Sequence, residues 1–280
     1  MTAFDFEIPR RTRSAAEDAI MGWIWSASLF LSGMILVMDP AASGERRPVD
    51  ASIVTAVDVS GSIDGYAERL ELEGLAEALE HPAFIHAIEQ GRVKSIGFAV
   101  FTWSSQNDFV LIEPWQRIAT SEQARAVAAR LRDLRRSARL RHHSFQGKRP
   151  WRTSLGTDVS AALEMGARLL RDAPFGSDRQ LLNIFANGVD NVGEPPDAAR
   201  DTAVAAGITV NGMILRDQPA VADYFRARVQ GGPGAFVMTV EHTDDLVDAV
   251  LAKFMLELAD DRWVPSSPLS DQVLALTSGL

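Results

Sequence analysis

The sequence predicts an α/β domain with a doubly wound, Rossmann-like, mostly parallel sheet that helices cover on both faces. Short apolar runs rich in β-branched residues, such as Ile53–Val59, have the length and composition of buried strands. Segments with helical periodicity separate these runs, and strands that alternate with helices form parallel sheets. The chain of 280 residues is long enough for one such domain with a large core.

The first 43 residues predict an export segment ahead of the domain. Arg10, Arg11 and Arg13 precede the uncharged apolar run Ile20–Met38. Basic residues before such a run are typical of a cleaved signal peptide, but this run is also long enough for a membrane anchor. A buried core helix is the less favoured alternative. We therefore expect a domain that is periplasmic or anchored to the outer face of the cytoplasmic membrane, with residues 44–50 as a linker.

The alternation of strands and helices extends over residues 51–259, which we expect to form one domain. Strands are expected at Ile53–Val59, Ser95–Thr102, Phe109–Ile112, Gln180–Ala186, Ile208–Leu215 and Ala235–Val240. Helices are expected at Tyr66–Leu79, Pro82–Gly91, Ser121–Leu134, Asp158–Leu170, Asp197–Ala206, Val221–Val229 and Asp244–Leu258. Pro114 is expected to close the third strand and Ser121 to cap the helix after it. Residues 260–280 predict a loosely ordered tail.

Polar residues follow the first strand at alternate positions, as Asp58, Ser60 and Ser62. In open α/β sheets, ligands bind at the edge formed by the carboxyl ends of the strands. One carboxylate and two hydroxyls make an all-oxygen set that suits Mg²⁺ or Mn²⁺ better than zinc. A serine-rich turn without any ligand is the alternative interpretation of the same residues.

This Asp-x-Ser-x-Ser pattern resembles the metal-ion-dependent adhesion site of von Willebrand factor A domains. A Gly-Thr pair at Thr157 and an Asn-Gly pair at Asn187 extend the resemblance to that family's second and third loops, in the family's order. The resemblance implies that Ser60, Ser62 and Thr157 bind Mg²⁺ or Mn²⁺ through their hydroxyls. It also implies that Asp58 and Asn187 bind the ion directly or orient its waters.

The second and third loops leave two questions open. Thr157 also suits a helix N-cap, a role that needs only its hydroxyl. Asn187 stands where the family normally has an aspartate, and a divalent cation held by fewer charges binds more weakly. Asp190, three residues further along, could compensate for the missing charge. Metal occupancy is therefore the property that the departure at Asn187 puts in question.

The resemblance covers about residues 51–259 and extends to a family of exported bacterial proteins that is known chiefly by its sequences. The additional matching features are the glycine-rich turn Gly231–Phe236, the pair Asn211-Gly212, and Leu256–Ala259. This family implies a von Willebrand A-like fold but brings no activity of its own. The glycine-rich turn suits a tight connection into the last strand better than a ligand site.

Charge is distributed unevenly along a chain whose net charge is −9, which argues against nucleic acid as a partner. Residues 125–152 contain ten Lys or Arg and one acid, Asp133. This segment could form a basic rim that attracts an acidic partner, a solvated helix face, or a surface for anionic lipid. Glutamates in the first helix predict another solvated face, formed by Glu71, Glu73, Glu77 and Glu80.

No catalytic motif emerges from the sequence, so we do not expect an enzyme. The absence of cysteine excludes thiol chemistry, and the five histidines show no metal-ligand spacing. The expected function is cation-dependent binding of another protein, whose acidic residue completes the coordination of Mg²⁺. One alternative is a metal-free scaffold with a degenerate ion site. The other is a metal-dependent hydrolase with Asp190 as its base.

Overall fold

The computed structural model describes residues 46–60, 67–105, 108–144, 156–215 and 218–259. The strands are β1 (Arg47–Pro48), β2 (Ala51–Asp58), β3 (Ile96–Trp103), β4 (Phe109–Ile118), β5 (Phe175–Gly176), β6 (Gln180–Ala186), β7 (Ile208–Leu215) and β8 (Val237–Val240). The helices are α1 (Ala67–Glu80), α2 (Pro82–Gln90), α3 (Ser121–Ser144), α4 (Val159–Arg171), α5 (Asp197–Ala205), α6 (Pro219–Arg228) and α7 (Leu246–Leu258), with a 3₁₀ turn at Thr243–Asp245 before α7.

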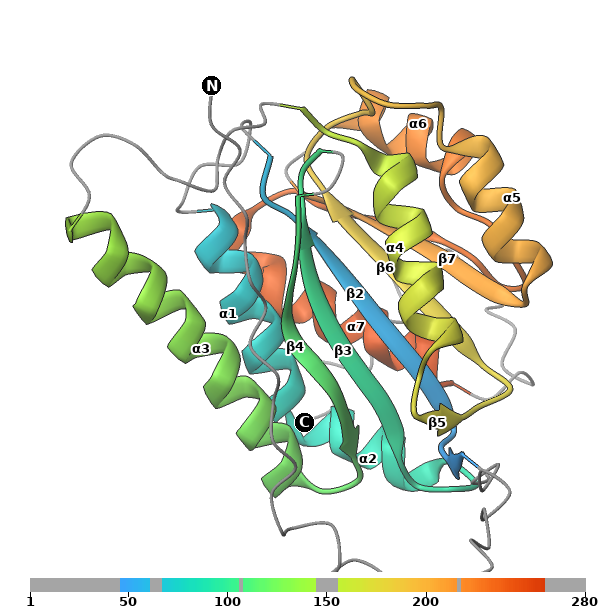
Figure 1. Ribbon diagram of the computed structural model, residues 1–280. Coiled ribbons are helices and arrows are strands. Elements are labelled where there is room, and N and C mark those ends of the chain that lie inside the picture. The colour runs from blue at the N-terminus through green and yellow to red at the C-terminus, as the bar shows by residue number, and fades with distance from the viewer. Residues whose placement is uncertain (1–45, 61–66, 106–107, 145–155, 216–217, 260–280) are drawn as a thin grey trace, which may run out of the picture. The chain divides into compact units, whose positions relative to one another are not determined.

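The described strands form a six-stranded sheet in the order β4-β3-β2-β6-β7-β8, and β1 pairs separately with β5 (Figure 1). Neighbouring strands of the large sheet are parallel except for β4, which is antiparallel to β3. The expected mostly parallel α/β sheet is confirmed. Its carboxyl edge is the end at which β2, β3, β6 and β7 finish.

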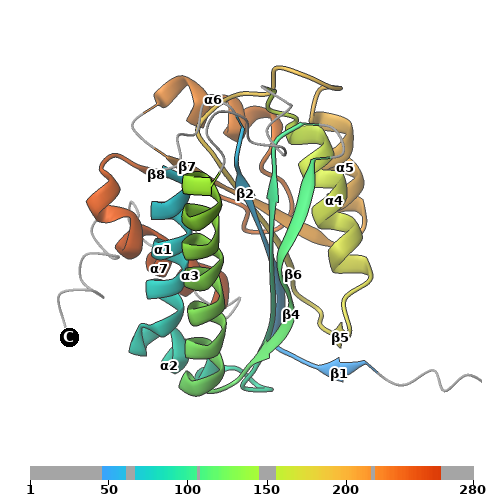
Figure 2. The same cartoon turned by 60° about the vertical axis from the view of Figure 1, so that its left-hand side comes forward.

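Helices cover both faces of the sheet, so the doubly wound arrangement is also confirmed (Figure 2). Helices α1, α2, α3 and α7 share one apolar core with the sheet, and α4, α5 and α6 share the other. Strand β2 contributes to both cores, because Ile53 and Val57 point to the first and Val54 and Ala56 to the second. This double burial explains why the central strands are apolar throughout.

The expectation that Pro114 ends the third strand is wrong, because β4 continues through it to Ile118. β4 is the outermost strand of the sheet, and its pairing with β3 shifts register between Val100↔Glu113 and Phe98↔Gln116. A proline, which lacks an N–H, is tolerated on an edge strand or at such an irregularity. The sequence could not show that this strand lies at an edge.

Helix α3 begins with a different cap and runs further than the sequence predicts. Thr120 Oγ1, rather than Ser121, accepts the N–H of Gln123 at 3.3 Å, and Gln123 Oε1 accepts the N–H of Ala119 at 2.8 Å. This resembles a capping box, except that Gln123 reaches the residue before Thr120 rather than Thr120 itself. The predicted end at Leu134 marks the end of the apolar stripe, but the helix itself continues to Ser144.

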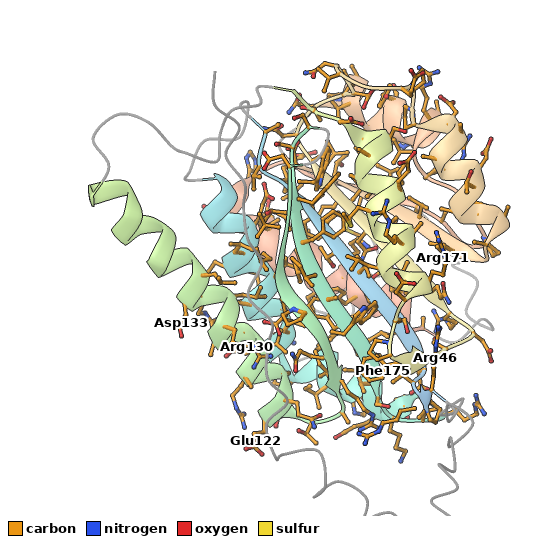
Figure 3. The ribbon with its side chains drawn as sticks, in the orientation of Figure 1. Arg46, Glu122, Arg130, Asp133, Arg171 and Phe175 are labelled. Carbon is orange, nitrogen blue, oxygen red and sulfur yellow. The ribbon has the colours of Figure 1, made fainter. Side chains whose placement is uncertain are left out.

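The two ends of the described domain lie at the amino edge of the sheet, opposite the carboxyl edge. At the first end, Arg46 donates from its guanidinium to the carbonyl of Arg171 at 3.1 Å, beside the β1–β5 pair that includes Phe175 (Figure 3). At the second end, Arg179, just before β6, donates to the carbonyl of Glu257 near the end of α7. Both ends are therefore fixed at the same edge.

The predicted export segment, including Ile20–Met38, and the predicted tail 260–280 lie outside the described residues. Within the residues that the structure describes, no helix combines the length and the apolar character needed to cross a bilayer. The choice between signal peptide and anchor stays a prediction.

A buried ion pair lies between α7 and the sheet. The Lys253 ammonium donates to Glu257 and, at 2.5 Å, to Asn183 Oδ1. The amides of Asn183 and Asn211, paired residues on β6 and β7, donate to Glu257 at 3.2 and 2.8 Å. Lys253 also lies 5.2 Å from the ring centroid of Phe236. Burial lowers the pKa of Lys253, and the neighbouring Glu257 carboxylate opposes that shift.

Candidate functional site

The first loop of the candidate site leaves the carboxyl end of β2. Asp58 is the last residue of this strand and is buried, as is Ser60. One Asp58 oxygen accepts the N–H of Ser60 at 2.7 Å, which fixes the turn beyond the strand. Val59 donates to the carbonyl of Trp103 at 2.8 Å, so this loop is also tied to the end of β3. Ser62, the third predicted ligand, lies outside the described residues.

The second loop brings Thr157 to the same edge, in front of α4. The alternative interpretation of Thr157 as the cap of this helix is wrong, because Asp158 occupies the N-cap and accepts the N–H of Ala161 at 2.9 Å. Asp158 also donates its own N–H to the carbonyl of Ser104, after β3, at 2.8 Å. Thr157 is buried one residue ahead of the cap. Its hydroxyl is therefore not used for capping.

The third loop follows β6 and begins with Asn187, which is 8% exposed. Strand β6 pairs with β2 up to Val57↔Phe185, so Asn187 leaves the sheet beside Asp58. The side-chain amide of Gln218, ahead of α6, donates to the Asn187 carbonyl at 2.8 Å. The backbone of this loop is thus held from a neighbouring connection.

Asp190 and Asn191 hold the third loop against the second. Asn191 Oδ1 accepts the N–H of Thr157 at 2.8 Å, and the Asn191 N–H donates to the Thr157 carbonyl at 3.0 Å. Asp190 Oδ1 accepts the N–H of Val159, the first residue of α4, at 2.7 Å. Asn191 thus hydrogen-bonds to Thr157, and Asp190 hydrogen-bonds to Val159, two residues further along. We call Asp190 and Asn191 the clamp. From the sequence, Asp190 was considered as a compensating charge near the ion or as the base of a hydrolase, and Asn191 was missed.

Burial shifts the ionisation of groups around this clamp. It raises the pKa of Asp158 and of Asp190, whose shift is increased by the negative charge of Asp158 and opposed by the hydrogen bond from Val159. Burial, with the nearby charge of Asp190, also raises the pKa of Tyr224 on α6 to about 12. The Tyr224 phenol therefore stays neutral at physiological pH.

The donor set of this edge fits a hard cation in the type of its atoms. Asp58, Ser60, Thr157 and Asn187 supply only oxygen and amide groups, and their three loops converge at one edge. The described part of the chain contains no group of three or more His, Asp or Glu residues that could hold a metal. The expected site is built mainly from hydroxyl groups and contains a single carboxylate. It therefore differs from a metal site built from three or more His, Asp or Glu residues.

Two arginines of the basic segment 125–152 are used inside the fold. Arg130 on α3 forms a two-pronged ion pair with the buried Glu113 of β4, at 2.8 and 3.0 Å (Figure 3). Arg132 contacts Glu73 at 2.7 Å and Glu80 at 2.9 Å on α1. These pairs anchor α3 to β4 and α1. The structure describes neither the side chains of residues 135–144 nor residues 145–155.

The prediction of a solvated glutamate face on α1 is correct only in part. Glu77 is exposed, but Glu73 and Glu80 pair with α3, and Glu71 is 1% exposed. Helical periodicity alone did not reveal that a second helix covers this face.

Comparison with protein families matches residues 48–262 to a family described as protein of unknown function (DUF1194). No curated protein matches the chain.

Among solved structures, the chain resembles proximal thread matrix protein 1 (PTMP1) from the mussel byssus, with a TM-score of 0.50 and 15% identity over 76% of this chain and 49% of that one. It also resembles the pilus adhesin SpaC from Lactobacillus rhamnosus GG, with a TM-score of 0.50 and 13% identity over 77% of this chain and 31% of that one. A second PTMP1 structure, with zinc in its MIDAS motif, gives a TM-score of 0.48 and 16% identity over 76% of this chain and 49% of that one. The chain thus spans half or less of these proteins. The expected von Willebrand A-like fold is confirmed.

Proposed function

The chain belongs to the family described as protein of unknown function (DUF1194), and we propose that its domain binds another protein through a divalent cation at the carboxyl edge. The observation that carries this proposal is the convergence of three loops far apart in sequence. Asp58, Thr157 and Asn187 all lie at this edge, and the hydrogen bonds of Asn191 and Gln218 hold their loops in place.

The residues that would hold Mg²⁺ or Mn²⁺ contribute different chemistry. Ser60, Thr157 and, outside the described residues, Ser62 offer neutral hydroxyls. Asp58 and Asn187 offer a carboxylate and an amide oxygen for the ion or for its waters. A cation held mainly by neutral groups keeps an uncompensated positive charge and attracts a carboxylate from outside. The partner's acidic residue would supply that carboxylate.

Binding rather than catalysis is the better proposal for this edge. A hydrolase would need a general base beside the ion, and Asp190 was the candidate. Asp190 Oδ1 instead accepts the N–H of Val159 at the start of α4, a structural role. We further propose, from the basic and apolar N-terminal sequence, that the domain acts outside the cytoplasm.

The alternative proposal is a scaffold that has lost its ion. The amide at Asn187, in place of the aspartate usual in von Willebrand A domains, favours this alternative because it removes one negative charge from the site. The two proposals differ in whether the isolated protein binds Mg²⁺ and in whether partner binding survives chelation.

Isothermal titration of Mg²⁺ and of Mn²⁺ into the wild type, Asp58→Ala and Asn187→Asp tests these proposals. We expect saturable binding by the wild type, none by Asp58→Ala, and roughly tenfold tighter binding by Asn187→Asp, because an added charge strengthens ion binding. Binding by Asn187→Asp alone would favour the scaffold. Equal binding by the wild type and Asp58→Ala would contradict the proposed ion site.

A further inference from the structure

Large apolar side chains on the described surface gather at the carboxyl edge. In the described ranges, the exposed large hydrophobic residues are Val110, Leu111, Val189 and Val192, at 52, 46, 39 and 40% exposure. An exposed apolar side chain in isolation is ordinary, but a group that borders one polar site indicates an interaction surface.

The four residues lie on both sides of the candidate ion ligands. On β4, Val110 and Leu111 pair with Thr102 and Phe101 near the end of β3, and the next residue of β3, Trp103, pairs with Asp58. As consecutive residues of a strand, Val110 and Leu111 point to opposite faces of the sheet, so each face of this edge carries one of them (strand order in Figure 1). On the other side, Val189 and Val192 belong to the loop that begins with Asn187.

Val192 also packs tightly against the second loop. A Cβ atom built on Gly156 would lie 2.5 Å from a Val192 methyl group, so this contact requires the glycine beside Thr157. Val192 therefore lies directly against the residue that precedes Thr157.

We propose that this edge receives an extended protein segment in which an acidic residue is flanked by aliphatic residues. The inference rests on the proposed function, because the acidic residue would reach the cation. From β4 to β6, the edge spans three strand spacings, about 14 Å. Aliphatic residues at positions −2 and +2 from the acid point the same way and lie about 13 Å apart, which matches this span.

The charge of α3 complements such an acidic segment. The helix starts at the amino edge after β4 and runs toward the carboxyl edge, so its last residues lie at the same end of the domain as the site (Figure 2). Residues 135–144 contain four arginines, two histidines and no acid. A positive helix end favours an acidic partner and speeds its encounter with the edge.

Fluorescence polarisation with synthetic peptides tests this inference. The labelled probe is the peptide Gly-Leu-Gly-Asp-Gly-Leu-Gly, and two matched peptides carry Ser for both Leu, or Asn for Asp. Binding is measured in Mg²⁺ and in EDTA. The protein variant Leu111→Ser/Val189→Ser removes one apolar side chain from each side, and circular dichroism checks that it folds.

We expect the leucine peptide to bind roughly tenfold tighter than the serine peptide, since each leucine buries part of its side chain. The double variant should lose this preference while its Mg²⁺ titration stays unchanged. Equal affinity of the leucine and serine peptides would overturn the inference of an apolar binding surface and would leave the proposed ion site intact. Failure of every peptide to bind a protein that binds Mg²⁺ would have the same meaning.

Two further outcomes separate this inference from the proposed function and from a membrane surface. A protein that binds no Mg²⁺ but keeps the leucine preference in EDTA would refute the ion and retain the apolar surface. Phosphatidylserine vesicles serve as the competing surface. Vesicle binding that Leu111→Ser/Val189→Ser abolishes, without any peptide preference, would overturn the inference in favour of lipid.

Discussion

Two buried polar clusters in this domain differ in the groups that contact their carboxylates. Between α7 and the sheet, the carboxylate of Glu257 meets the ammonium of Lys253 and two amide donors, so the chain neutralises its own charge. At the carboxyl edge, three carboxylates accept hydrogen bonds from neutral groups. Asp58 and Asp190 accept backbone N–H groups, and Asp108 accepts the hydroxyl of Ser104.

The difference separates polar groups that stabilise the fold from those suited to a ligand. A buried carboxylate is costly unless it is paired and hydrogen-bonded. At the edge, the hydrogen bonds from neutral donors fix the orientation of the carboxylates. The α7 cluster supplies its own cation, whereas the carboxyl edge is where we propose that an ion binds. Three changes would break or sharpen this comparison.

The largest effect is expected from Lys253→Met. This change leaves the Glu257 carboxylate buried without its cation, and breaking a buried ion pair costs about 3–5 kcal/mol. Urea unfolding measures the loss. The double variant Lys253→Met/Glu257→Leu removes both charges and should recover most of the stability. A loss of less than about 1 kcal/mol in the single variant would mean that the pair is not an essential part of the core.

A smaller effect is expected from Asn191→Ala at the clamp. The N–H of Thr157 loses its acceptor, which costs about 1–3 kcal/mol of stability. Removal of groups that position metal ligands weakens binding by roughly ten- to a hundredfold, so Mg²⁺ affinity should fall by about that factor. Asn191→Asp keeps the Oδ1 acceptor and is the matched control. Unchanged Mg²⁺ affinity in Asn191→Ala would show that the clamp does not position Thr157 for the ion.

The smallest effect is the pH dependence of Asp190→Asn in metal-free buffer. The folded state raises the pKa of Asp190, so this group stabilises the fold at acid pH and loses that contribution as pH rises through the raised pKa. Asparagine keeps the acceptor for Val159 and does not titrate. The stability of the variant relative to the wild type should therefore increase from pH 3 to pH 7, as measured by chemical unfolding. A decrease over that range would contradict the assigned direction.

The sequence predicted the central strands well because tertiary context agreed with local pattern. β6 and β7 have the predicted bounds, since both are apolar runs buried on two sides. Prediction failed where a neighbour decides the outcome. Pro114 is tolerated because β4 is an edge strand, and α3 continues beyond Leu134, where its apolar stripe ends.

The residue types of the candidate site could be identified from the sequence, but the contacts between its loops could not. The pattern around Asp58 identified the edge, and the structure brings Thr157 and Asn187 to it. Hydrogen bonds between distant loops, such as that of Asn191 with Thr157, leave no periodic signal in a sequence. The α7 cluster did leave a signal in the sequence, since Asn183 and Asn211 are single amides inside apolar strands. We did not interpret them as parts of a buried polar cluster. Ion binding itself stays a prediction.

Attachment of both described ends at the amino edge has a practical consequence for assays of this domain. A linker, tag or solid support joined before Arg46 or after Leu258 attaches at the end of the sheet opposite the ligand loops. The eight residues of β2 separate the amino and carboxyl edges of the sheet by about 26 Å. Capture of residues 46–259 on a sensor through either of these ends therefore leaves the carboxyl edge facing the solution, where a soluble analyte reaches it without hindrance from the support.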